Sequence, residues 1–77
     1  MLTGEQIRAA RALLRWDQKK LAEASAISLP TIKRLEAIKG KVSAYTGTVD
    51  KIQKALEAAG VEFLDDDAPG VRLRRSN

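Results

Sequence analysis

The chain has 77 residues, which is enough for one small domain and too few for a large core. It contains no cysteine and no histidine, which excludes a disulfide framework, a thiolate metal site, a thiol nucleophile and a histidine general base. The net charge is +4, and the excess lies in residues 1–60, which hold eleven Lys and Arg against six Asp and Glu. Such a basic surface suits a polyanionic partner, although charge alone fits a generic basic protein equally well.

The first two helices are each marked by a side chain that caps a helix. Thr3 precedes the first, and Gln6 stands three residues later as the second half of a capping box. Apolar residues at helical spacing then continue this helix over about 4–15. Asp17 is the expected cap of a second, shorter helix over about 18–25.

The third helix is predicted over about 28–39. Ser28 is its expected cap, and Pro30 falls in the first turn, where its missing N–H costs nothing. Gly40 is the first glycine after this helix, and we expect it to take the left-handed conformation that ends a helix. In the linker before the helix, Ala26 is expected to be the only strained turn residue, at a cost of roughly 1–2 kcal/mol.

The fourth helix is predicted to begin at its cap Thr48 and to end at Gly60. After Gly60 the apolar residues change from a helical period to the alternation of strands, and Pro69-Gly70 is a turn signal. Residues 61–77 are therefore predicted to form a β-hairpin. The alternative is a charged tail without regular structure.

The hairpin is also the expected dimerisation element, because two short strands alone are marginal in water. Four apolar side chains on one of its faces need cover: Val61, Phe63, Val71 and Leu73. A second copy would supply it by packing the hairpin faces together or by joining strand edges into a larger sheet. In the alternative, the hairpin covers only its own helices and the dimer forms through the fourth helix.

The most informative stretch runs from Gln18 to Ala37. Two short helices joined by two or three residues must cross steeply, which is typical of a helix-turn-helix. The predicted fold is therefore mainly α, a bundle of four helices with a helix-turn-helix and a short C-terminal β-hairpin. Residues 1–60 form the expected binding domain, and residues 61–77 form the appended hairpin.

This stretch resembles the lambda-repressor and Cro family, also called XRE-type transcriptional regulators. The resemblance rests on Gln18, Leu21-Ala22, Ile27-Ser28, Thr31-Ile32 and Leu35-Glu36, together with IRAAR at residues 7–11. The chain departs from the family at Ala26 and near Ile38, where glycine is usual or frequent. The resemblance implies a helical, usually dimeric protein that binds operator DNA with its third helix in the major groove.

A helix in the major groove presents its first turns to the base edges. The outward positions of the third helix are then the candidate base contacts, namely Ser28, Leu29, Pro30, Lys33 and Arg34. Candidate phosphate contacts are Gln18, which the resemblance also implies, and four residues of the following loop, namely Lys39, Lys41, Ser43 and Tyr45. The alternative for the charged positions is an ordinary solvated surface.

Arg11 and Glu36 both fall inside apolar stripes of their helices. Two opposite charges that point inward are expected to pair, because an unpaired buried charge is very costly. The family resemblance implies the same structural pair, holding the first helix against the third. A role for Glu36 as a general acid is disfavoured, since the chain has no histidine, no second carboxylate at a fixed spacing and no metal motif.

These features predict a prokaryotic or phage transcriptional regulator that binds double-stranded DNA at a palindromic operator as a homodimer. We expect no enzymatic activity, cofactor or metal. No apolar run approaches the roughly 20 residues of a membrane span, and charge begins at Glu5, so a cytoplasmic protein without a membrane partner is expected. Two alternatives remain. One is an antitoxin that binds both DNA and a toxin, and the other is a protein-interaction module that has lost DNA binding.

Overall fold

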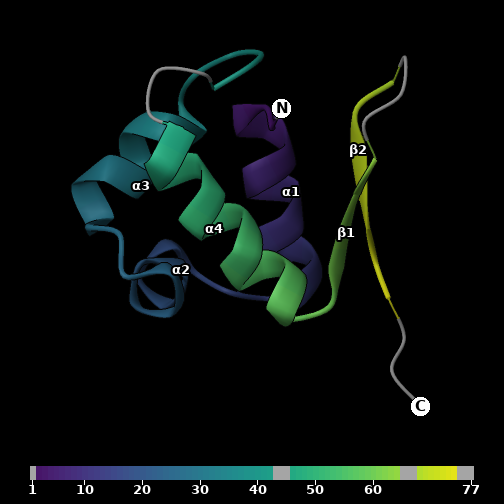
Figure 1. Cartoon of the computed structure of the whole chain (residues 1–77), viewed down its shortest axis with the longest axis horizontal. Helices are drawn as coiled ribbons and strands as arrows, with labels where there is room; N and C mark the ends of the chain where they lie inside the picture. Colours follow the sequence, from purple (N-terminus) through teal and green to yellow (C-terminus); the bar gives the residue numbers. More distant parts are fainter. Residues whose placement is uncertain (1, 43–45, 65–67, 75–77) are drawn as a thin grey trace.

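The computed structural model describes residues 2–42, 46–64 and 68–74. Within these residues the chain is mainly helical, and a short antiparallel hairpin follows the helices. The elements in chain order are α1 (Gly4–Leu14), α2 (Gln18–Ser25), α3 (Leu29–Glu36), α4 (Thr46–Ala58), β1 (Val61–Leu64) and β2 (Gly70–Leu73). The hairpin lies against α1 and α4, and α3 lies on the side of the molecule away from the hairpin (Figure 1). No described helix has the length and apolar character needed to cross a membrane.

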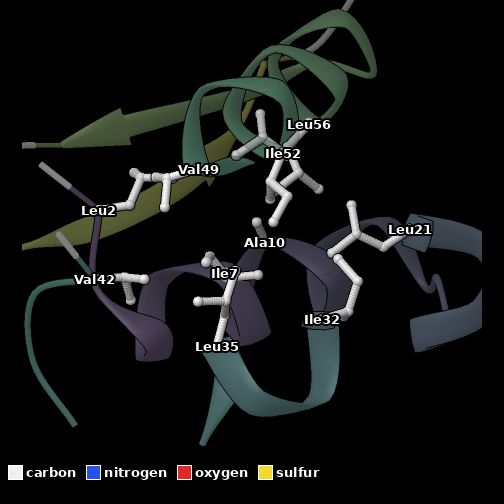
Figure 2. Close-up of a cluster of buried hydrophobic side chains, with 11 residues drawn as sticks. Leu2, Ile7, Ala10, Leu21, Ile32, Leu35, Val42, Val49, Ile52 and Leu56 are labelled. Carbon is white, nitrogen blue, oxygen red and sulfur yellow. The ribbon is translucent and has the colours of Figure 1, made fainter. Parts of the chain in front are cut away.

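The core lies where the four helices meet. Ile7 and Ala10 of α1 point toward Leu21, Ile32 and other side chains of the remaining helices (Figure 2). The apolar side chains of this cluster are almost fully removed from solvent: Leu2, Ile7, Ala10, Leu21, Ile32, Leu35, Val42, Val49, Ile52, Leu56 and Val61. Burial of a side chain of the size of Leu or Ile contributes about 1.5–3 kcal/mol. Since Val61 belongs to the same cluster, the hairpin shares the core of the helices.

Both ends of α1 are fixed by hydrogen bonds that the chain makes locally. The capping box is confirmed, because the Thr3 hydroxyl accepts from the N–H of Gln6 at 3.0 Å and the Gln6 side chain accepts from the N–H of Thr3 at 2.9 Å. At the other end Arg15 is left-handed, with φ of 57°, and the N–H of Trp16 donates to the carbonyl of Arg11. The prediction that Ala26 is the only strained turn residue is therefore wrong, since Arg15 occupies the same region.

The connection from α2 to α3 is three residues long, as the sequence predicts. Asp17 caps α2 through the N–H of Lys20, and Ser28 caps α3 through the N–H of Thr31. Between the two helices Ala26 takes the expected left-handed conformation, with φ of 60°. Its N–H and that of Ile27 both donate to the carbonyl of Ala22, which closes the end of α2.

The helix α3 ends at Glu36, so the prediction that it continues to Lys39 is wrong. Gly4 lies so close to the backbone just after α3 that a Cβ atom on residue 4 would lie 2.2 Å from the carbonyl oxygen of Ile38. The N–H of Gly4 also donates to the carbonyl of Gly40 at 3.2 Å, so the chain after α3 pairs with the N-terminal segment. These contacts divert the backbone from the helical path. Gly40 does have a positive φ of 87°, but it lies in the loop and not at the helix end.

The helix α4 begins at Thr46, and Thr48 is its third residue and not its cap. A glycine inside a helix costs roughly 0.5–1 kcal/mol relative to alanine, which is why the sequence favours a start after Gly47. Tertiary packing outweighs this local cost. The predicted end is confirmed at Gly60, which has a φ of 109°.

The predicted hairpin is confirmed, with Val61 opposite Leu73 and Phe63 opposite Val71. Gln6 of α1 fixes the hairpin to the helices. Its side-chain amide donates to the carbonyls of Leu64 and Gly70, each at 3.0 Å, while its oxygen completes the capping box. The hairpin is therefore held at its turn end by a buried polar side chain and along its length by apolar contact.

Candidate nucleic-acid interface

The outer face of α3 is basic and carries no exposed acid. Lys33 and Arg34 are both exposed, and Lys39 and Lys41 follow, also exposed, in the loop after the helix. The single acid in α3 is Glu36, which is turned inward and is 3% exposed. A surface with one sign of charge concentrates counter-charged ligands, so this face favours an anion.

The start of α3 has a different chemistry. Leu29 is half-buried and Pro30 is exposed, so both leave apolar surface accessible beside the basic residues. Ser28 is also exposed, but its hydroxyl donates to the Thr31 hydroxyl at 2.9 Å and caps the helix. Ser28 therefore has its donor engaged within the chain, and an external partner would meet it as an acceptor.

The predicted pair of Arg11 and Glu36 is confirmed. The guanidinium Nε and Nη2 of Arg11 donate to the two carboxylate oxygens of Glu36 at 2.7 and 2.8 Å, which is the strong bidentate arrangement. This hydrogen bonding raises the pKa of Arg11 against the opposing effect of its partial burial. Nη1 donates to the carbonyl of Trp16 at 2.9 Å, so the same side chain also holds the turn after α1.

Gln18, the predicted phosphate contact, is the first residue of α2 and is half-buried. Its side-chain Nε2 donates to Oε1 of Glu36 at 3.0 Å. Because a carboxylate only accepts hydrogen bonds, this contact fixes which end of the Gln18 amide faces Glu36. Arg11, Glu36 and Gln18 thus form one network that connects α1, α3 and the start of α2, and the sequence indicated only the Arg11–Glu36 part of it.

The loop after α3 is fixed by α1. The Glu5 carboxylate accepts from the N–H of Gly40 at 3.1 Å. The pKa of Glu5 is lowered, first by a hydrogen bond from its own backbone N–H and then by that of Gly40. Glu5 therefore orders the backbone between Lys39 and Lys41. The other two predicted loop contacts, Ser43 and Tyr45, lie outside the described residues.

A further contact at the start of α2 was not predicted. The ammonium of Lys20 lies 5.7 Å from the centre of the Trp16 ring, within the range of a cation–π interaction. The only sequence signal for it is the spacing of an aromatic residue four positions before a lysine. It places one more positive charge beside the helix start that carries Gln18.

The four apolar residues assigned to dimerisation have unequal positions. Val61 is 2% exposed and lies in the core, while Phe63 and Val71 are half-buried and pack against that core. Leu73 is 44% exposed. Val61, Phe63 and Val71 therefore serve their own helices, so packing of this face against a second copy is not available to Val61.

Within the described ranges no group of three or more Cys, His, Asp or Glu side chains is placed to hold a metal ion. Comparison with models of known protein families and with curated proteins gives no match for this chain. The inference of function therefore depends on the geometry and charge of the chain itself.

Proposed function

We propose that the protein is a sequence-specific double-stranded DNA-binding protein and a transcriptional regulator, with α2 and α3 forming a helix-turn-helix of the lambda-repressor type. The observation that carries this proposal is the charge arrangement of α3. Lys33 and Arg34 stand on its outer face, while its one acid, Glu36, is buried in a bidentate pair with Arg11. A helix with this arrangement presents only positive charge to a polyanion.

In the proposed complex α3 enters the major groove, which admits an α-helix. Lys33 and Arg34 donate to O6 and N7 of guanine, and Leu29 and Pro30 offer apolar contact to a thymine methyl group. Basic residues of the loop, Lys39 among them, meet phosphates and set the register of the protein on the duplex.

With α3 in the major groove, the start of α2 faces the DNA backbone, and Gln18 is placed there to bind a phosphate. One hydrogen of its amide is taken by Glu36, which leaves the second hydrogen for a phosphate oxygen. In the first turn of α2 the N–H of Lys20 is bonded to the Asp17 carboxylate, while the N–H groups of Gln18 and Lys19 have no acceptor within the helix and carry a partial positive charge. The start of α2 is therefore suited to a phosphate on the strand beside the groove.

Selection of bound duplexes from a random pool tests this proposal. We expect enrichment of one half-site sequence. Arg34→Ala should relax specificity at one position and weaken binding by about 1–3 kcal/mol. Gln18→Ala should weaken all duplexes more evenly. Lys54→Ala, on α4 and outside this face, is the matched control and should leave binding unchanged.

Salt dependence distinguishes the alternatives. Contacts to several phosphates make affinity fall steeply as salt rises, because each contact releases bound counterions. If no duplex is enriched and no salt-dependent binding is measured, the proposal fails and a protein-interaction module becomes the better explanation. Equal affinity of the wild type and Arg34→Ala for the selected site would remove the assignment of Arg34 alone.

A further inference from the structure

The outermost part of α3 is apolar. Pro30 is exposed and points away from the core, because Ile32 and Leu35, the buried apolar residues of this helix, project from its opposite side. Ala37, about two turns further along and just past the helix end, is exposed as well. The line that projects furthest from the molecule on this helix therefore carries no charge.

Pro30 also lacks a hydrogen-bond donor on its backbone. It is the second residue of α3, in the turn where free N–H groups ordinarily attract a polar partner. Proline has no N–H, and its ring has neither donor nor acceptor. The neighbouring hydroxyls of Ser28 and Thr31 are bonded to each other at 2.9 Å. The surface at Pro30 therefore favours a nonpolar group of a ligand over a phosphate.

Two cations flank this apolar position. Lys33 and Arg34 stand three and four residues after Pro30, so they are its neighbours on the helix surface, with Cβ atoms about 5–6 Å away. Both are exposed, and both match the O6 and N7 acceptors of guanine. Successive bases are about 3.4 Å apart along the duplex axis. A guanine bound to one of these cations and a group in contact with Pro30 therefore belong to neighbouring base pairs.

The same face lacks the side chains that best recognise adenine and cytosine. Adenine is bound through its amino group by Asn or Gln, and cytosine by Asp or Glu. The helix α3 contains one residue of these types, Glu36, which is 3% exposed and bonded to Arg11 and Gln18. The outer face is left with donors and apolar surface. In the major groove these match guanine and the C5-methyl group of thymine.

We propose that the outer face of α3 recognises a pyrimidine C5-methyl group beside a guanine, whether the methyl belongs to thymine or to 5-methylcytosine. The inference rests on the proposed function and adds the class of base step that α3 binds. In 5-methylcytosine the methyl occupies the same ring position as in thymine, so it projects into the major groove in the same way. Contact with Pro30 requires only this methyl. Methylation of cytosine in a half-site therefore strengthens binding, and occupancy of the DNA responds to methylation.

The methyl group can be separated from the other groove atoms of the pyrimidine. Thymine and 5-methylcytosine differ at C4, where thymine has a carbonyl acceptor and cytosine an amino donor. A cation that bound only the thymine carbonyl would bind thymine and uracil equally. Recognition of the methyl gives a different order, with thymine above uracil and 5-methylcytosine above cytosine.

Four duplexes that differ at one position test the proposal. In the half-site obtained by selection we expect a pyrimidine next to a guanine. At that pyrimidine the duplexes carry thymine, uracil, 5-methylcytosine or cytosine, each with its complement, and fluorescence anisotropy gives the dissociation constants. Each methyl group should raise the affinity about fourfold, the effect of burying one group of methylene size. The gain should be similar in the two pairs of bases.

Pro30→Ser and Pro69→Ser are matched variants at the two prolines of the chain. Pro30→Ser replaces the apolar ring with a hydroxyl and restores the N–H, so both affinity ratios should fall close to one. Pro69 is exposed next to β2, and the hairpin lies on the side of the molecule away from α3 (Figure 1). Pro69→Ser should therefore keep the fourfold ratios. Circular dichroism should show that both variants fold.

A ratio close to one in the wild type, for either pair of bases, would overturn the proposal. Ratios that persist in Pro30→Ser would overturn it too, and so would a selected half-site without a pyrimidine next to a guanine. All these results come from a duplex that the protein binds. They are therefore distinct from failure of the proposed function, in which no duplex is enriched.

Discussion

The α2–α3 segment and the β1–β2 hairpin both carry charged side chains, but they arrange them in opposite ways. In α3 the acid Glu36 is buried against Arg11, and the basic residues remain outside. In the hairpin Glu62 lies on the surface with Arg72 and Arg74. Hydrogen bonds from the two arginines lower the pKa of Glu62, and the bond from Arg72 has the larger effect.

The position of the acid relative to the basic residues decides whether the charges of a segment face outward or pair with one another. In α3 the helix's own acid, Glu36, is buried against Arg11, so the outer face of this helix carries basic residues and no acid of the helix itself. Where one glutamate lies beside two arginines, as in the hairpin, part of the positive field is cancelled and the charges pair with one another. Exposed ion pairs of this kind contribute little to stability, typically 0–1 kcal/mol, so the hairpin depends on its apolar face and on Gln6.

The largest expected effect on stability follows from breaking the buried pair of Arg11 and Glu36, which keeps the acid of α3 away from its outer face. Arg11→Met or Glu36→Leu alone should lower the free energy of unfolding by about 3–5 kcal/mol, because each leaves the other charge without its partner. The double variant should lose less than the sum of the two. Urea unfolding of the four proteins measures the coupling. Strict additivity would show that the two side chains do not depend on each other.

A smaller effect is expected at the link between α1 and the hairpin. Gln6→Met keeps the side-chain length but removes the donor to the carbonyls of Leu64 and Gly70 and the acceptor for the N–H of Thr3. The unfolding free energy should fall by about 1–3 kcal/mol. Hydrogen exchange of the hairpin amides should rise more than that of α3. Gln53→Met, at a solvent-exposed bond to Glu57, is the control, and an equal effect there would contradict this role of Gln6.

The smallest effects are expected at Arg15 and Ala26, the two described residues other than glycine that have a positive φ. Ala26→Gly and Arg15→Gly should each stabilise the protein by up to ~1 kcal/mol, because glycine adopts positive φ without strain. Ala24→Gly inside α2 is the matched control and should destabilise by roughly 0.5–1 kcal/mol. Thermal unfolding distinguishes the two directions. If Ala26→Gly behaved like Ala24→Gly, strain at the α2–α3 turn would be excluded.

The sequence by itself determined the features that depend on neighbouring residues. The caps at Thr3, Asp17 and Ser28, the left-handed turn at Ala26 and the end of α4 at Gly60 all follow from short-range hydrogen bonding and backbone sterics. The alternation of apolar residues likewise indicated the hairpin. The inward positions of two opposite charges were enough to predict their pairing, because a buried charge needs a partner wherever it lies.

Only the tertiary structure decided the features that join distant segments. The end of α3 is set by the close approach of Gly4 and by pairing with the N-terminal segment. No residue near Ile38 in the sequence indicates that the helix ends there. The attachment of Gln18 to Glu36 and of Gln6 to the hairpin likewise crosses between elements. Local patterns record which groups need a hydrogen bond or burial, and packing decides which distant group supplies it.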